Sequence, residues 1–150
     1  MSKEMKLMPE LRFLEFDRAS EWQLQTLRKV LIKNSKKNKS LKHNLVQSVS
    51  NKHGFINQED YFDNRRVASK DTSNYYVIKK GYFAYNPSRI NIGSIAYNQS
   101  NEIGFVSPMY VVFKNSNLKN LNNNFLFYLL KSELGIQKII EKSIGTVRNT

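Results

Sequence analysis

The segment Asn86–Asn91 holds two amide side chains and one guanidinium, and it directly follows a run of aromatic residues. Arginine can bind guanine through two parallel hydrogen bonds, and asparagine can do the same with adenine. The segment therefore predicts a loop that contacts base edges, with Asn86, Arg89 and Asn91 as candidate DNA-binding residues. An ordinary β-turn is the alternative, because Asn followed by Pro commonly begins one.

A basic segment lies at residues 33–42, without any acidic residue. Its lysines are Lys33, Lys36, Lys37, Lys39 and Lys42. Lysines of this kind can neutralise DNA phosphates, which releases counterions and makes binding depend on salt. We expect phosphate contacts from Lys36, Lys37 and Lys39, and from Arg148 near the end of the chain. The alternative is a solvated basic loop, since phosphate contacts carry no sequence information.

Tyrosines and cations alternate between residues 75 and 89, a pattern that could stack on bases or hold a nucleic-acid backbone. The stronger alternative is sheet core, because alternation turns half of these rings inward. Among them Tyr85 is a candidate contact. His53 follows a turn-forming stretch and is either a base contact or merely exposed.

The sequence gives no set of catalytic or metal-binding residues. His43 and His53 are ten residues apart without a convincing third ligand, and the acids at 59–63 precede Arg65 and Arg66, which indicates local ion pairs. Asn86-Pro87 resembles the start of an amino-methyltransferase motif, but Ser and Arg occupy the later positions and no glycine-rich cofactor loop is found. We expect no enzyme activity, cofactor or metal.

Composition sets the class of partner. Lys and Arg number 24 against 12 Asp and Glu, for a formal charge of +12 and a pI near 9.9. Such a charge attracts polyanions, nucleic acid ahead of anionic membrane, although an AT-rich genome also enriches lysine. With 40% hydrophobic residues, no cysteine and no signal-like or membrane-spanning apolar run, we expect a folded cytoplasmic domain.

The elements that would position these residues follow from apolar spacing. We expect an arm at 1–21 that docks through its apolar patch, and one domain at 22–150.

Leucines at 24, 27 and 31 predict a helix beginning near Trp22. Residues 45–49, 75–78, 82–85 and 105–113 predict strands, the last interrupted at Pro108, and 57–72 a short helix and loop. Gly93 and Gly104 indicate a polar loop.

Two apolar stripes after residue 117 predict two helices separated at Gly135. The fold class is therefore α/β in the broad sense, more narrowly α+β. We expect a twisted mixed or antiparallel sheet with flanking helices.

Several segments together resemble the specificity subunit of type I restriction-modification systems, HsdS. The first is Pro9–Phe13 with Glu15, Phe16 and Trp22, and the next is Ser48–Ser50 with Gly54. The longest match runs over residues 74–94 and is taken up again over 104–113, and residues 143–148 resemble the close of a recognition domain. Leu14 stands where the family usually has Pro, and Arg28 replaces an expected Gly.

The resemblance implies a target-recognition domain that reads one half of a bipartite duplex DNA target. Methylation and cleavage would then belong to the partner methyltransferase and restriction subunits. The family would continue beyond Thr150 into a conserved helix and a second recognition domain, so the resemblance leaves three alternatives: a truncated gene product, a half-subunit that works with another fragment, or an isolated domain. The alternatives are a protein-interaction fragment that joins or blocks the complex without its own DNA affinity, and a generic RNA-binding domain.

Overall fold

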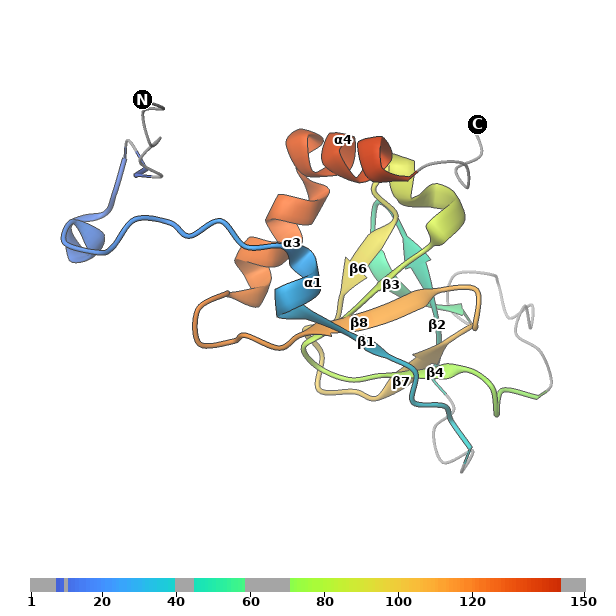
Figure 1. The fold of residues 1–150 in the computed structure, drawn as a ribbon. Coiled ribbons are helices and arrows are strands. Elements are labelled where there is room, and N and C mark those ends of the chain that lie inside the picture. The colour runs from blue at the N-terminus through green and yellow to red at the C-terminus, as the bar shows by residue number, and fades with distance from the viewer. Residues whose placement is uncertain (1–7, 10, 40–44, 59–70, 144–150) are drawn as a thin grey trace.

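The strands of the computed structural model fall into two four-stranded sheets (Figure 1), within residues 8–9, 11–39, 45–58 and 71–143, which are the residues that the structure describes. The first sheet is antiparallel throughout. In spatial order its strands are β1 (Leu31–Asn34), β8 (Val111–Asn115), β5 (Tyr82–Tyr85) and β6 (Ile95–Tyr97).

The second sheet is mixed. In spatial order its strands are β3 (Gly54–Asn57), β2 (Val46–Ser50), β7 (Gly104–Val106) and β4 (Tyr76–Ile78). The β2–β7 pair is parallel, whereas the β2–β3 and β4–β7 pairs are antiparallel. The chain therefore has an α+β fold, with its strands divided between two sheets where the sequence predicted one.

Small and β-branched side chains fill the space between the two sheets. Ala84, Ala96 and Val112 from the first sheet form one buried cluster with Ile78 and Val106 from the second. The alanines let the second sheet approach the first closely, because their side chains add little volume. This cluster is the core that fixes the two sheets on each other.

Two helices cover the other face of the first sheet. They are α3 (Asn123–Lys131) and α4 (Glu133–Lys142), shown in orange and red in Figure 1. The rings of Phe83 and Phe113 stack at a centroid distance of 5.1 Å, and Leu126 and Leu130 of α3 pack on them. The apolar face of α3 is thus buried against the aromatic residues of the first sheet.

Main-chain hydrogen bonds join the two sheets beside β1. The Val77 N–H of β4 donates to the Lys36 carbonyl at 2.8 Å, and the Asn38 N–H donates to the Tyr75 carbonyl at 2.9 Å. The predicted basic loop is therefore paired backbone over residues 36–38, with its lysine side chains left exposed. Lys42 lies outside the described residues.

The expected helix at Trp22 is wrong for most of its length. Only α1 (Leu27–Val30) is helical there, and Leu31 already pairs with Asn115 in the first sheet. The leucine spacing arises from one helical turn followed by a strand. Beyond Gln58, the predicted helix and loop up to residue 70 lie outside the described residues.

The break between the final helices falls at Ser132 rather than at Gly135. The Ser132 hydroxyl accepts a hydrogen bond from the Gly135 N–H at 3.0 Å, which caps α4. A Cβ added at Gly135 would lie 2.0 Å from the Leu129 carbonyl oxygen. Gly135 is needed for the close approach of α3 to the first turn of α4. Ile144, the last residue of the second predicted apolar stripe, lies outside the described residues.

The arm extends away from the two sheets (Figure 1), in contrast to the docking expected from its apolar residues. Its single short helix in the described part is the 3-10 turn η1 (Leu14–Phe16). Leu11 and Leu14 are 92% and 93% exposed. Where the arm meets the domain, Trp22 packs edge-on against Phe125 of α3 at a centroid distance of 5.2 Å.

Candidate nucleic-acid interface

The loop after β5 folds into the 3-10 segment η2 (Pro87–Ile92), and Asn86 is its cap. The Asn86 Oδ1 atom accepts a hydrogen bond from the Ser88 N–H at 3.0 Å. The residue is only 9% exposed. The amide thus stabilises the local backbone, as in the turn that was the alternative to base contact, and it is not presented to a ligand.

Arg89 and Asn91 lie on η2 itself, with Arg89 exposed and Asn91 half-buried. Gly93 ends the segment with a φ of 75°, a left-handed conformation that glycine adopts without strain. The Ser94 N–H donates to the Arg89 carbonyl at 3.2 Å. Arg89 is therefore carried on a short, hydrogen-bonded backbone rather than on an extended loop.

Lys131 connects this segment to the turn between β2 and β3. Its ammonium donates to the Asn51 carbonyl at 2.8 Å, to Asn51 Oδ1 at 2.7 Å and to the Gly93 carbonyl at 2.8 Å. Burial lowers the pKa of the Lys131 ammonium below its usual 10.5, while the three oxygens favour its charged form. Lys131 fastens both loops to the end of α3.

This connection joins the β2–β3 turn, which holds His53, to the segment that holds Arg89 and Asn91. We define these two stretches, residues 51–53 and 89–93, as the η2 edge. His53 is exposed in the turn, where its main-chain N–H donates to Ser50 Oγ at 3.2 Å. The η2 edge lies near the top of the molecule in Figure 1. His53 thus belongs to a turn that Lys131 connects to the segment carrying Arg89 and Asn91, a connection that spacing along the chain did not indicate.

Lys131 itself was missed, because its type and its place in an amphipathic stripe give no sign of a distant partner. A half-buried lysine that binds main-chain oxygens from two loops is visible only once the fold places residues 51, 93 and 131 together. Spacing along the chain cannot reveal this.

The lysine segment, Lys36–Lys39, lies elsewhere. Lys36, Lys37 and Lys39 are exposed and surround a shallow hollow of about 600 Å³ with Ser35. Lys37 Nζ also donates to Asn74 Oδ1 at 3.0 Å. Figure 1 shows this segment, at the cyan end of β1, far below the η2 edge. The predicted phosphate contacts and base contacts therefore form two separate surfaces.

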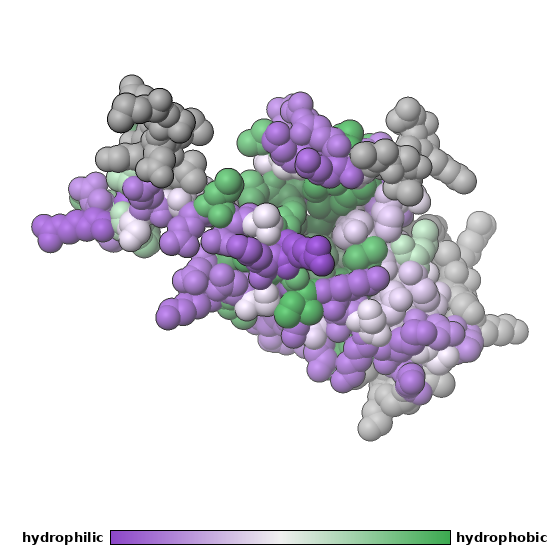
Figure 2. Space-filling view, in the orientation of Figure 1, coloured by the Kyte–Doolittle hydropathy of each residue, from purple (hydrophilic) through white to green (hydrophobic). Residues whose placement is uncertain are grey.

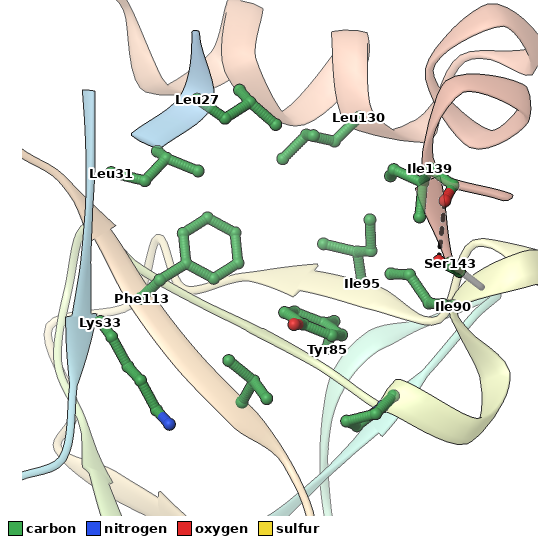
Figure 3. A pocket seen from close by; sticks show the side chains of 12 residues that line it. Leu27, Leu31, Lys33, Tyr85, Ile90, Ile95, Phe113, Leu130, Ile139 and Ser143 are labelled. Atoms are coloured by element: carbon green, nitrogen blue, oxygen red, sulfur yellow. Dashed lines mark hydrogen bonds between the residues drawn. The ribbon is translucent and has the colours of Figure 1, made fainter. Parts of the chain in front are cut away.

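Tyr85 faces neither surface. Its ring lies in the apolar groove between the first sheet and the helices, beside Ile95 and Phe113 (Figure 3). Burial raises the pKa of the Tyr85 phenol above its usual 10.0. The predicted nucleic-acid contact is corrected to a packing residue, because alternation along β5 turns this side chain toward the helices.

Other predicted groups fall outside the described residues, namely Arg148, His43 and the acidic and basic run at 59–66. Across the ranges that are described, no three side chains of the metal-ligating types gather into a metal site. In those same ranges no helix has the length and apolar character needed to cross a membrane. On α4, the side chains of Lys138 and Glu141 form an exposed ion pair at 3.2 Å.

The chain matches no protein-family model, and a search of curated proteins found no match either.

Proposed function

We propose that this chain binds duplex DNA with sequence specificity, as one target-recognition domain of a type I restriction-modification specificity subunit. The η2 edge is the observation that carries the proposal. It includes an exposed guanidinium, an exposed imidazole and a half-buried amide, carried on two short loops that Lys131 holds together. These are groups that hydrogen-bond base edges in the major groove.

The charge of the chain supports the same assignment. At +12, the protein attracts DNA before any base contact forms. The lysine segment adds three exposed ammonium groups on a backbone fixed by β4. In this proposal the lysines supply affinity, and Arg89, Asn91 and His53 supply discrimination.

The resemblance to HsdS supports the family assignment. Its longest stretch, residues 74–94, spans β4, β5 and η2, and so includes the η2 part of the candidate base-reading surface. The domain would read one half of a bipartite target in the cytoplasm, while partner subunits methylate or cleave. No catalytic role is assigned to this chain.

The deciding experiment is a selection from random duplex DNA, with the chain alone and with a methyltransferase subunit added. We expect one short motif to be enriched. On that motif Arg89→Ala should weaken binding by about 1–3 kcal/mol while leaving affinity for unrelated duplexes unchanged.

The matched control is Arg28→Ala, which removes an exposed guanidinium from α1 and should affect both kinds of duplex alike. Equal loss on all sequences for Arg89→Ala would exclude base reading by this residue. Better binding to single-stranded RNA than to the enriched duplex would contradict the DNA assignment.

A second candidate function is a protein-interaction fragment that joins or blocks a restriction complex without useful DNA affinity. The exposed apolar side chains of the arm and of α3 favour it, since large exposed apolar surfaces mark interaction sites. Co-purification with a methyltransferase subunit, together with no DNA shift at low salt, would favour this function over the first.

A further inference from the structure

The arm carries more exposed apolar surface than a solvated tail requires. Its large exposed side chains are Met8, Leu11, Phe13, Leu14, Phe16, Trp22 and Leu24. Phe13 is 78% exposed, and Leu14 in the adjoining turn is 93% exposed. Leaving such residues in water is unfavourable, at a cost that scales with their apolar area, so this arrangement indicates a surface that is covered by a partner.

The arm is also ordered by its own hydrogen bonds before any partner binds. The Arg12 guanidinium donates hydrogen bonds to the Phe16 carbonyl at 3.2 Å, to the Ser20 carbonyl at 3.0 Å and to the Ala19 carbonyl. These bonds close residues 12–20 into a hook with η1 inside it. A segment ordered before binding loses less conformational entropy when it docks.

The domain offers an apolar groove of matching character. It has a volume of about 400 Å³ and lies between the first sheet and the helices (Figure 3), with Leu27, Leu31, Phe113, Leu130 and Ile139 in its walls. In Figure 2, hydrophobic surface gathers in the hollow below α4 and is bordered by hydrophilic side chains. We call this feature the helix groove.

Charge favours contact between the arm and the helix groove. Residues 8–26 contain four carboxylates against two guanidiniums, for a net charge of −2. Residues 27–34 and α4, which border the groove, contain five cations against two carboxylates, for a net charge of +3. An acidic, apolar segment therefore complements the net positive charge of two elements that line the apolar hollow, of which Lys33 lies in the lining itself.

We propose that the arm of one copy docks in the helix groove of a second copy, and that the exchange is reciprocal. In Figure 1 the arm leaves the domain beside α3 and extends away from the two sheets. Backbone at the junction is extended, with Thr26 at a φ of −79° and a ψ of 143°. Reciprocal exchange forms every arm–groove contact twice, which makes it a low-cost route to a dimer.

The natural absence of cysteine allows a direct test. Leu14→Cys is made in one full-length chain, and Lys33→Cys, an exposed position lining the groove, is made in another of different mass. We expect the mixed chains to form a disulfide-linked heterodimer. Its yield should clearly exceed that of Leu14→Cys mixed with Lys119→Cys, which places the thiol on an exposed loop after β8.

Three results would overturn the proposal. One is cross-linking no better than the Lys119→Cys control, and another is a wild-type chain that sediments as a monomer at high micromolar concentration. The third is a chain carrying both Leu14→Cys and Lys33→Cys that closes an internal disulfide when dilute, because the arm would then cover its own groove.

A second variant tests the same contact without cysteine. Phe13→Asp with Leu14→Asp alters two exposed side chains, so circular dichroism should show an unchanged fold. Sedimentation should then show the dimer weakened about tenfold or more. Unchanged dimerisation would remove the arm from the interface. None of these measurements depends on DNA binding, so the exchange can fail or hold independently of the proposed function.

Discussion

The Asn86 side chain has a structural partner, the Ser88 N–H, at 3.0 Å. Asn86→Ala would leave that N–H without its cap, and we expect the free energy of unfolding to fall by about 1 kcal/mol. Urea denaturation measures this loss. Asn86→Asp keeps the acceptor and should retain most of the stability.

Asn91→Ala provides the contrast on the same segment. Asn86, not Asn91, is the side chain that caps η2. Replacing Asn91 should therefore change stability little and should instead lower affinity for the selected DNA site. A larger stability loss for Asn91→Ala than for Asn86→Ala would contradict the division of roles between these two amides.

Tyr85 gives a prediction for alkaline pH. Burial raises the pKa of its phenol above 10.0, so the folded chain holds this proton more tightly than the unfolded chain. The contribution of Tyr85 to stability is complete below pH 10 and is lost as pH rises through the folded pKa. Tyr85→Phe should therefore reduce the loss of stability above about pH 10.

Urea midpoints of the wild type and of Tyr85→Phe, compared at neutral and alkaline pH, measure this difference. Tyr97→Phe on β6 is the control, because it removes a phenol from the same sheet face. A specific loss of DNA affinity in Tyr85→Phe at neutral pH would instead restore this residue to the interface.

At the scale of elements, Lys131 makes α3 part of the η2 edge. Lys131→Met removes three hydrogen bonds to the two loops but keeps the aliphatic stem. Asn51 is exposed, so its freed oxygens can reach water, and we expect a stability loss of about 0.5–1.5 kcal/mol. Discrimination between DNA sequences should fall more strongly, since Asn51 and Gly93 are no longer held together.

Hydrogen exchange and binding to the selected DNA motif measure the two effects. Lys138→Met, on the exposed face of α4, removes the same charge without touching either loop. If Lys138→Met reduced discrimination equally, charge rather than loop position would explain the result.

The elements that were predicted correctly are those whose residue types are typical of buried strands. The predicted strands at 75–78 and 82–85 correspond to β4 and β5, and the predicted strand at 105–113, interrupted at Pro108, overlaps β7 and the start of β8. β6 was missed because its three residues, Ile95–Tyr97, are too few to show alternation. β1 was missed because Leu31 completes a helical spacing with Leu27, although its actual partner is on β8.

Which of the chosen polar residues lie at the surface could not be predicted from residue type. Arg89, Asn91 and His53 were chosen for their chemistry, and their contact with DNA stays a prediction; Lys131 connects the two loops that carry them. Tyr85 and Asn86 were chosen on equal grounds, yet one faces the groove and the other caps η2. Whether a polar side chain faces solvent depends on strand register and turn geometry, which residue type alone does not determine.

At the scale of the molecule, the two surfaces make a prediction about salt. Lys36→Ala with Lys37→Ala should lower the dependence of DNA affinity on salt by about one phosphate contact per lysine removed. Loss should be uniform across sequences, because the lysine segment lies apart from the η2 edge.

Titrations over a range of salt concentrations, on both the selected duplex and an unrelated one, measure the slope. The control is Lys114→Ala with Lys119→Ala, two exposed lysines outside the lysine segment. An unchanged slope in the Lys36/Lys37 variant would remove the lysine segment from the interface.

The main-chain bonds from Lys36 and Asn38 to β4 have a consequence for evolution. Backbone groups make these bonds, so they survive almost any substitution at positions 36, 37 and 39. Mutations there can accumulate without unfolding the domain, and the strength of its attraction to polyanions can drift while its architecture stays constant. A library randomised at these positions should retain the fold in most members and vary chiefly in affinity.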